Sequence, residues 1–98
     1  MTIKYNHFLT LDNAILKSKD LIAKSLLEYK GQYSKFTENW QGDLCKYEII
    51  AKGQKIYGQI KVDRNLVLLD ISLPWIFLLF ESKIKKEIES KLFQHFKS

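Results

Sequence analysis

Four successive segments between residues 33 and 73 alternate polar and apolar side chains with a period of two, and this alternation constrains the fold most. Tyr47 and Ile49, for example, alternate with Lys46 and Glu48. A period of two places one set of side chains on each face of a strand. We therefore predict four half-buried strands, with the sequences YSKFTENW, LCKYEIIA, KIYGQIKVD and LVLLDISL.

The connections between these segments are short: QGD at 41–43, KGQ at 52–54 and DRN at 63–65. Each contains Gly or Asn, the residues that best supply the positive φ of tight hairpins. Consecutive strands joined in this way predict an antiparallel meander.

Helical periodicity flanks the meander on both sides. Residues 11–31 follow Thr10, a natural N-cap, and end at Gly31, which suits a helix C-terminus. A second helix is predicted after Pro74, with Ser72 as its N-cap. Its inward stripe recurs at every fourth position, at Ile76, Phe80, Ile84, Ile88, Leu92 and Phe96.

An additional short strand is predicted at residues 3–8, IKYNHF. The predicted fold is thus α+β, in the order β-α-β-β-β-β-α, as one domain over residues 1–98 with both helices on one face of an antiparallel sheet. The sequence leaves open which strand the first one pairs with.

Composition and charge narrow the class of protein. The chain is 46% hydrophobic and 28% charged, with a formal net charge of +5, which is typical of an ordinary globular domain. Arg64 is the only arginine, so the charge is read as solvating and nucleic acid is disfavoured as a partner. The lone Cys45 and the lack of a secretory signal predict a cytoplasmic location.

The stretch LPWIFLLF (73–80) raises the question of a membrane. The apolar run from 66 to 80 is too short for a spanning helix, contains Asp70 and is broken by Pro74, so we predict no transmembrane segment. The first two turns of the helix predicted after Pro74 are apolar all round. Their side chains must be covered by the first helix, by a second subunit in a homodimer, or by a hydrophobic surface. The residues in question are Trp75, Phe77, Leu78 and Leu79.

The sequence motifs give little support for an enzymatic function. His7 and His95 show no metal-site spacing, Cys45 lies on an apolar strand face, and no phosphate-binding glycine loop occurs. We predict no catalytic residue, metal or cofactor. Gly58 lies mid-strand on the inward face, where either a helix or Trp40 presses close, or a hydrophobic ligand such as an acyl chain binds between sheet and helices.

An ordered series of features along about 90 residues resembles a known family. It comprises His7 and Leu9 before the capped helix, the turn Trp40-x-Gly42-Asp43, the strand GQIKV (58–62) and the junction VLLDISLPWIFLLF (67–80). Together they resemble the polyhydroxyalkanoic acid system family. The surface departs from that family's pattern in being richer in lysine and poorer in arginine.

The resemblance implies a non-catalytic role connected with polyhydroxyalkanoate storage granules, at their surface. Its expected partners are the hydrophobic granule surface or proteins on it. On physical grounds, Trp75, Phe77, Leu78 and Leu79 are the residues expected nearest such a surface, with flanking lysines reaching back to water. The alternative is a small carrier of an acyl chain or similar ligand, with Trp40 and Gly58 at its binding site.

Overall fold

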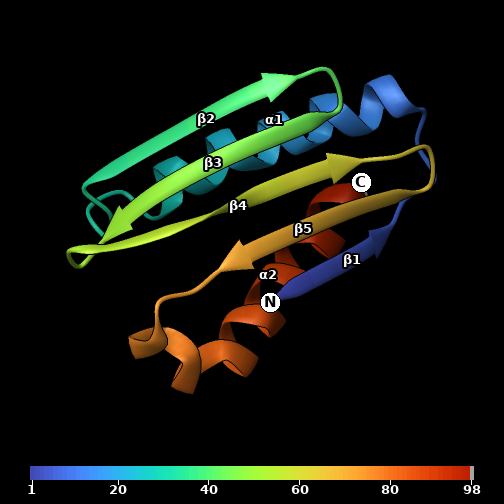
Figure 1. Ribbon diagram of the computed structural model, residues 1–98. Coiled ribbons are helices and arrows are strands. Elements are labelled where there is room, and N and C mark those ends of the chain that lie inside the picture. The colour runs from blue at the N-terminus through green and yellow to red at the C-terminus, as the bar shows by residue number, and fades with distance from the viewer. Residues whose placement is uncertain (98) are drawn as a thin grey trace.

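In the computed structural model, which describes residues 1–97, a five-stranded antiparallel sheet carries two helices on one face (Figure 1). The elements are β1 (Thr2–Asn6), α1 (Leu11–Glu28), β2 (Lys35–Gln41), β3 (Leu44–Ala51), β4 (Gln54–Val62), β5 (Leu66–Ser72), the 3-10 helix η1 (Trp75–Phe80) and α2 (Glu81–Phe96). This confirms the predicted α+β class and element order.

The sheet has the strand order β1-β5-β4-β3-β2, so β2 to β5 form the predicted meander. Positive φ occurs at Gly42 and at the pair Lys52–Gly53, as expected of tight hairpins. The connection at 63–65 has no positive-φ residue, so that part of the prediction is wrong. It closes instead by a hydrogen bond of 2.7 Å from the amide of Asp63 to the carbonyl of Leu66.

The first strand pairs antiparallel with β5, from Thr2 opposite Asp70 to Asn6 opposite Leu66. Its inward side chain, Ile3, is almost fully buried. The amide of His7 continues the contact by bonding to the carbonyl of Asn65 at 3.0 Å. The terminal strand β1 therefore forms one edge of the sheet and β2 forms the other.

The second helix differs from its prediction at its start. Ser72 is the last residue of β5 and caps no helix, while Pro74 immediately precedes η1. A 3-10 helix has three residues per turn, so positions four apart do not stay on one face. Ile76 and Phe80, predicted to be inward, are both exposed, whereas Phe77 is half-buried. The stripe holds from Ile84 onward, where α2 is a true α-helix.

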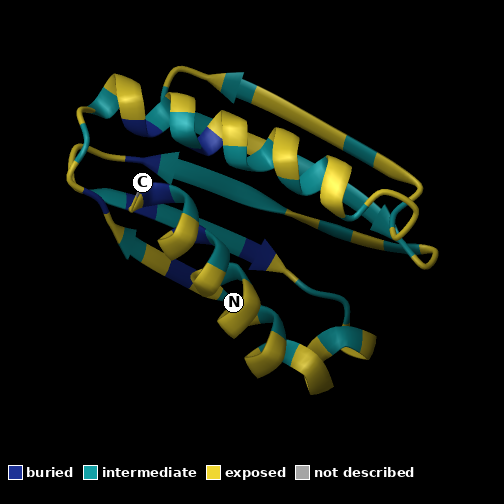
Figure 2. Cartoon of the chain, turned by 180° about the vertical axis from the view of Figure 1, so that it is seen from behind, coloured by how far each residue is buried: buried dark blue, intermediate teal, exposed yellow. Residues whose placement is uncertain are grey.

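The tightly packed core occupies one end of the helix–sheet interface. Its members come from β1, α1, β4, β5 and α2, and they are Ile3, Ala14, Val62, Val67, Ile71, Leu92 and Phe96. Figure 2 shows the buried colour gathered toward the end where the C-terminus lies, while α1 and α2 are half-buried or exposed toward the other end. Helices and sheet are therefore closely packed at one end only.

Candidate functional site

A large apolar groove lies between the helices and the sheet at the end away from the tight core. Its volume is about 1010 Å³, at the upper limit of the usual range for small-molecule sites. We call it the helix–sheet groove. Its apolar lining includes Leu21, Ile22, Leu26, Phe36, Ile49, Ile56, Ile60, Leu69, Leu73, Phe77, Ile84 and Ile88. All twelve of these side chains are only half-buried.

The wall formed by α1 explains why the space stays open. Thr10 caps the helix by accepting a hydrogen bond of 3.2 Å from the amide of Asn13, which fixes where the helical pattern begins. Two inward positions, Ser18 and Ser25, are small, and the Ser18 hydroxyl is turned to its own helix, donating to the carbonyl of Ala14 at 2.9 Å. Small side chains at these positions leave volume that a leucine would fill.

Polar contacts join the two helices above this space. The Tyr29 hydroxyl donates to Glu87 Oε1 at 2.6 Å, and Lys91 Nζ lies 2.6 Å from Glu28 Oε2. Lys91 also lies over the Tyr29 ring, 5.0 Å from its centroid. The bond to Glu28 raises the pKa of Lys91, and burial with the Glu87 bond raises the pKa of Tyr29. Tyr29 and Lys91 line the groove, and we call this pair of side chains its roof. The roof is polar on the outside and is held by charge-assisted bonds.

The charged side chains that line the groove are both basic. They are Lys52, exposed in the β3–β4 turn, and Lys91 in the roof. No acidic side chain is among the lining residues. The exposed residues Gly31 and Gln32, after α1, line the groove beside this turn. The groove therefore opens to solvent at a basic rim.

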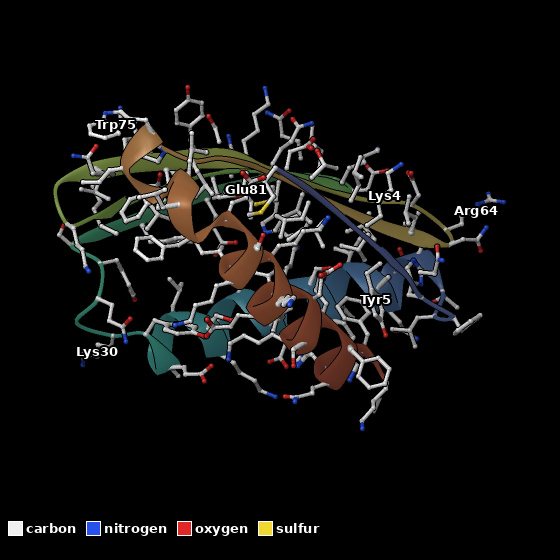
Figure 3. All side chains as sticks on the ribbon, turned by 90° about the horizontal axis from the view of Figure 1, so that it is seen from below. Lys4, Tyr5, Lys30, Arg64, Trp75 and Glu81 are labelled. Atoms are coloured by element: carbon white, nitrogen blue, oxygen red, sulfur yellow. The ribbon has the colours of Figure 1, made fainter. Side chains whose placement is uncertain are left out.

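The 3-10 helix η1 lies at this end of the molecule and carries an exposed apolar surface. Trp75 is 82% exposed, Leu79 91% and Leu78 51%, whereas Phe77 is half-buried and lines the groove. In Figure 3, Trp75 and Lys30 lie at one end of the molecule and Arg64 lies at the other. We call Trp75, Leu78 and Leu79 the η1 patch; its role as a contact surface stays a prediction.

Within residues 1–97, no helix is both long enough and apolar enough to cross a membrane. The 3-10 helix itself has six residues. This agrees with the reading of LPWIFLLF as a strand-to-helix junction.

Glycine is required at position 58 because of neighbouring groups that the sequence did not indicate. A Cβ at Gly58 would overlap the carbonyl oxygen of Asp70 and lie 2.8 Å from the Tyr47 hydroxyl. That hydroxyl donates to the same carbonyl at 2.8 Å, and burial raises the pKa of Tyr47. The expectation that a helix or Trp40 presses on Gly58 is therefore wrong, because Tyr47 and the β5 backbone occupy the space.

Trp40 and Gly58 are not brought together around the helix–sheet groove. The Trp40 indole donates to Glu38 Oε2 at 2.9 Å and lies 5.3 Å below Lys19 Nζ, outside the groove lining. Gly58 lines a second hollow of about 650 Å³ that also includes Leu78. Ligand contact by Trp40 or Gly58 stays a prediction.

The histidine and cysteine considered for chemistry have structural partners. His7 is buried; its Nδ1 accepts from the amide of Leu9 at 3.2 Å, and its Nε2 lies 2.7 Å from the carbonyl of Asp63. Because Nδ1 accepts a hydrogen bond, the ring donates from Nε2 to the Asp63 carbonyl. Cys45 is fully buried, and burial raises the pKa of its thiol. No group of three or more potential metal ligands occurs within residues 1–97.

Most of the groove residues were read from the sequence as ordinary core positions. Ile84 and Ile88, for example, are predicted from their spacing as part of the inward stripe of the second helix, and Ile22 and Leu26 of α1 face them as ordinary apolar residues of a helix. The available signal was the pair of serines on the inward face of α1, Ser18 and Ser25. Small polar residues within an apolar stripe indicate incomplete filling.

Comparison with known proteins identifies a family for this chain. A family model described as "Putative polyhydroxyalkanoic acid system protein" matches residues 1–96. No curated protein and no solved structure matches the chain. The match covers every strand and helix described above.

Proposed function

We propose that this chain, which belongs to the polyhydroxyalkanoic acid system protein family, is a non-catalytic protein that attaches to the hydrophobic surface of polyhydroxyalkanoate granules. The η1 patch is the contact surface of this proposal. The single observation that carries it is the exposure of Trp75 and Leu79, at 82% and 91%.

Large apolar side chains grouped on one short element favour contact with another apolar phase. Single exposed hydrophobic residues are ordinary, whereas grouped ones mark interaction sites. Trp75, Leu78 and Leu79 lie within five residues of one another on a helix with no buried side chain. Burial of a leucine-sized side chain stabilises contact by about 1.5–3 kcal/mol, so a few such side chains suffice for reversible attachment.

The residues that follow η1 suit an interface between an apolar phase and water. Lys83, Lys85 and Lys86 are exposed on the first turns of α2. Lysine can lay its methylene chain along an apolar surface and keep its ammonium group in water. Tryptophan likewise presents an apolar body and a polar tip at such boundaries.

Binding to bare polyester tests the proposal. We expect the protein to co-sediment with amorphous poly(3-hydroxybutyrate) particles, and Leu79→Ser to weaken that binding about tenfold, because one buried leucine is lost at the interface. Trp75→Ser should weaken it at least as much. The matched control is Leu16→Ser, a leucine on α1 that is 62% exposed and outside the groove.

Three results would contradict attachment of the η1 patch to polyester. Equal loss with Leu79→Ser and Leu16→Ser would mean that binding is not located at η1. If sedimentation instead shows a homodimer that Leu79→Ser converts to monomers, the η1 patch is a subunit interface. Binding only to particles that carry other granule proteins would assign the patch to a protein partner.

The helix–sheet groove favours a second candidate function, the carriage of an acyl chain or similar ligand. The supporting observation is a volume of about 1010 Å³ bounded by half-buried aliphatic side chains. Phe77 lines the groove from η1, next to the η1 patch. A chain leaving an apolar surface would therefore have a short path into the groove.

Isoleucine methyl resonances report on this second candidate directly. On titration with 1-decanol we expect shifts at Ile49, Ile56, Ile60 and Ile88, which line the groove, but not at Ile50, which follows Ile49 along β3 and is not a lining residue. The variant Ile56→Trp should weaken binding because the indole fills the space that the chain would occupy. Shifts confined to Ile76 in η1 would place the alcohol on the η1 patch and refute groove binding.

A further inference from the structure

The charges at the groove rim restrict the chemistry of what can enter it. The charged lining residues are Lys52 and Lys91, and no carboxylate lines the space. A ligand with a negative group at the rim meets complementary charge, while a cationic one meets repulsion. This asymmetry distinguishes ligands that share the same hydrocarbon chain.

The two lysines are not equivalent. Lys91 Nζ is already neutralised by Glu28 at 2.6 Å and lies over the Tyr29 ring. Lys52 takes part in no ion pair within the described chain. Its backbone has a φ of 52° in the β3–β4 turn, and its side chain is exposed. Lys52 is therefore the rim cation whose charge is available to a ligand.

The two ends of the groove also differ in polarity. Its inner end reaches Ser18, Ile71 and Leu92, which are buried, and the Ser18 hydroxyl is already used within its helix. An ionised group placed there would lose its hydration without a compensating partner. A charged head group must therefore stay at the Lys52 end, with the chain directed inward.

We propose that the helix–sheet groove binds alkyl carboxylates, with the carboxylate at Lys52 and a single hydrocarbon chain directed toward Ile71 and Leu92. This inference rests on the second candidate function above and adds the class of ligand and its orientation. The contacts between Tyr29 and Glu87 and between Lys91 and Glu28 bridge the roof, so the hydrocarbon chain lies between these contacts and the sheet.

The experiment compares decanoate with 1-decanol at neutral pH, below the concentration at which either self-associates. The dissociation constant of each is taken from isoleucine methyl shifts in the wild type, in Lys52→Gln and in Lys55→Gln. Lys55 is a suitable control because it lies on the same hairpin, pairs with Glu48 at 3.6 Å and is outside the groove lining. Both variants lower the net charge by the same amount.

We expect decanoate to bind the wild type about threefold to fivefold more tightly than 1-decanol, as one exposed ion pair allows. Lys52→Gln should remove that preference and Lys55→Gln should keep it. The preference should also shrink in high salt, because the head group lies at the solvent boundary.

The remaining outcomes separate the inference from its premise. If both ligands bind the groove equally and Lys52→Gln changes neither constant, groove binding stands and the carboxylate assignment is overturned. If the preference disappears equally in both variants, it reflects net charge alone, and the assignment is also overturned. If neither ligand shifts the groove methyls, the second candidate function and the inference are both overturned.

Discussion

At the scale of single residues, Gly58 shows how a backbone contact determines an amino-acid type. The Tyr47 hydroxyl crosses Gly58 to reach the carbonyl of Asp70. Sequence alone indicated that something needs the room at a mid-strand glycine, and this was correct. It could not indicate that a tyrosine on the neighbouring strand takes it, because cross-strand register is a property of the folded sheet.

Gly58→Ala should therefore destabilise the protein by about 2 kcal/mol or more. The added methyl group overlaps the β5 backbone, which cannot move easily, and displaces the half-buried Tyr47 hydroxyl from its acceptor. The midpoint of urea unfolding measures the loss. Tyr47→Phe is the companion variant, because it removes only the hydroxyl. If the double variant Gly58→Ala/Tyr47→Phe is no less stable than Gly58→Ala alone, the added methyl group and the Tyr47 hydroxyl compete for one site. An unchanged midpoint in Gly58→Ala would contradict the close approach.

At the scale of elements, the two helices differ in how well their starts could be predicted. Thr10 is a local signal, since its side chain bonds to an amide three residues on. The start of α2 carried no such signal, because η1 continues the apolar composition of the helix in a different helical geometry. The four-residue spacing of Ile76 and Phe80 therefore did not indicate a shared inward face. Composition indicates that a segment is helical more readily than it indicates the number of residues per turn.

Thr10→Ala should lower the free energy of unfolding by about 1 kcal/mol, because an orphan amide at the start of α1 loses its acceptor. Thr10→Ser retains the hydroxyl and should stay close to the wild type. Chemical denaturation of the two variants gives the comparison. Equal losses in both would attribute the effect to the threonine methyl group and contradict the capping role.

At the scale of the whole molecule, the layer arrangement was predictable and the groove was not. Periodicity shows which face of each element is apolar, and hence that two helices cover one face of the sheet. It does not show how far the layers are apart. Ile22 and Ile88, which line the groove, have the same residue type as Ile3 in the tight core. The candidate site was therefore predicted between sheet and helices, but not at the residues that line it.

The pairing of β1 with β5 also governs the order in which the fold can assemble. Asn6 and Leu66, the nearest paired residues of these strands, are separated by the whole of α1 and the first three strands of the meander. Hairpins close over a few residues, whereas this contact closes a long loop and forms late on entropic grounds. During synthesis β1 emerges before the meander and finds its partner only after β5 has left the ribosome. Until then the apolar residues of β1, Ile3 and Tyr5, stay uncovered in a nascent chain.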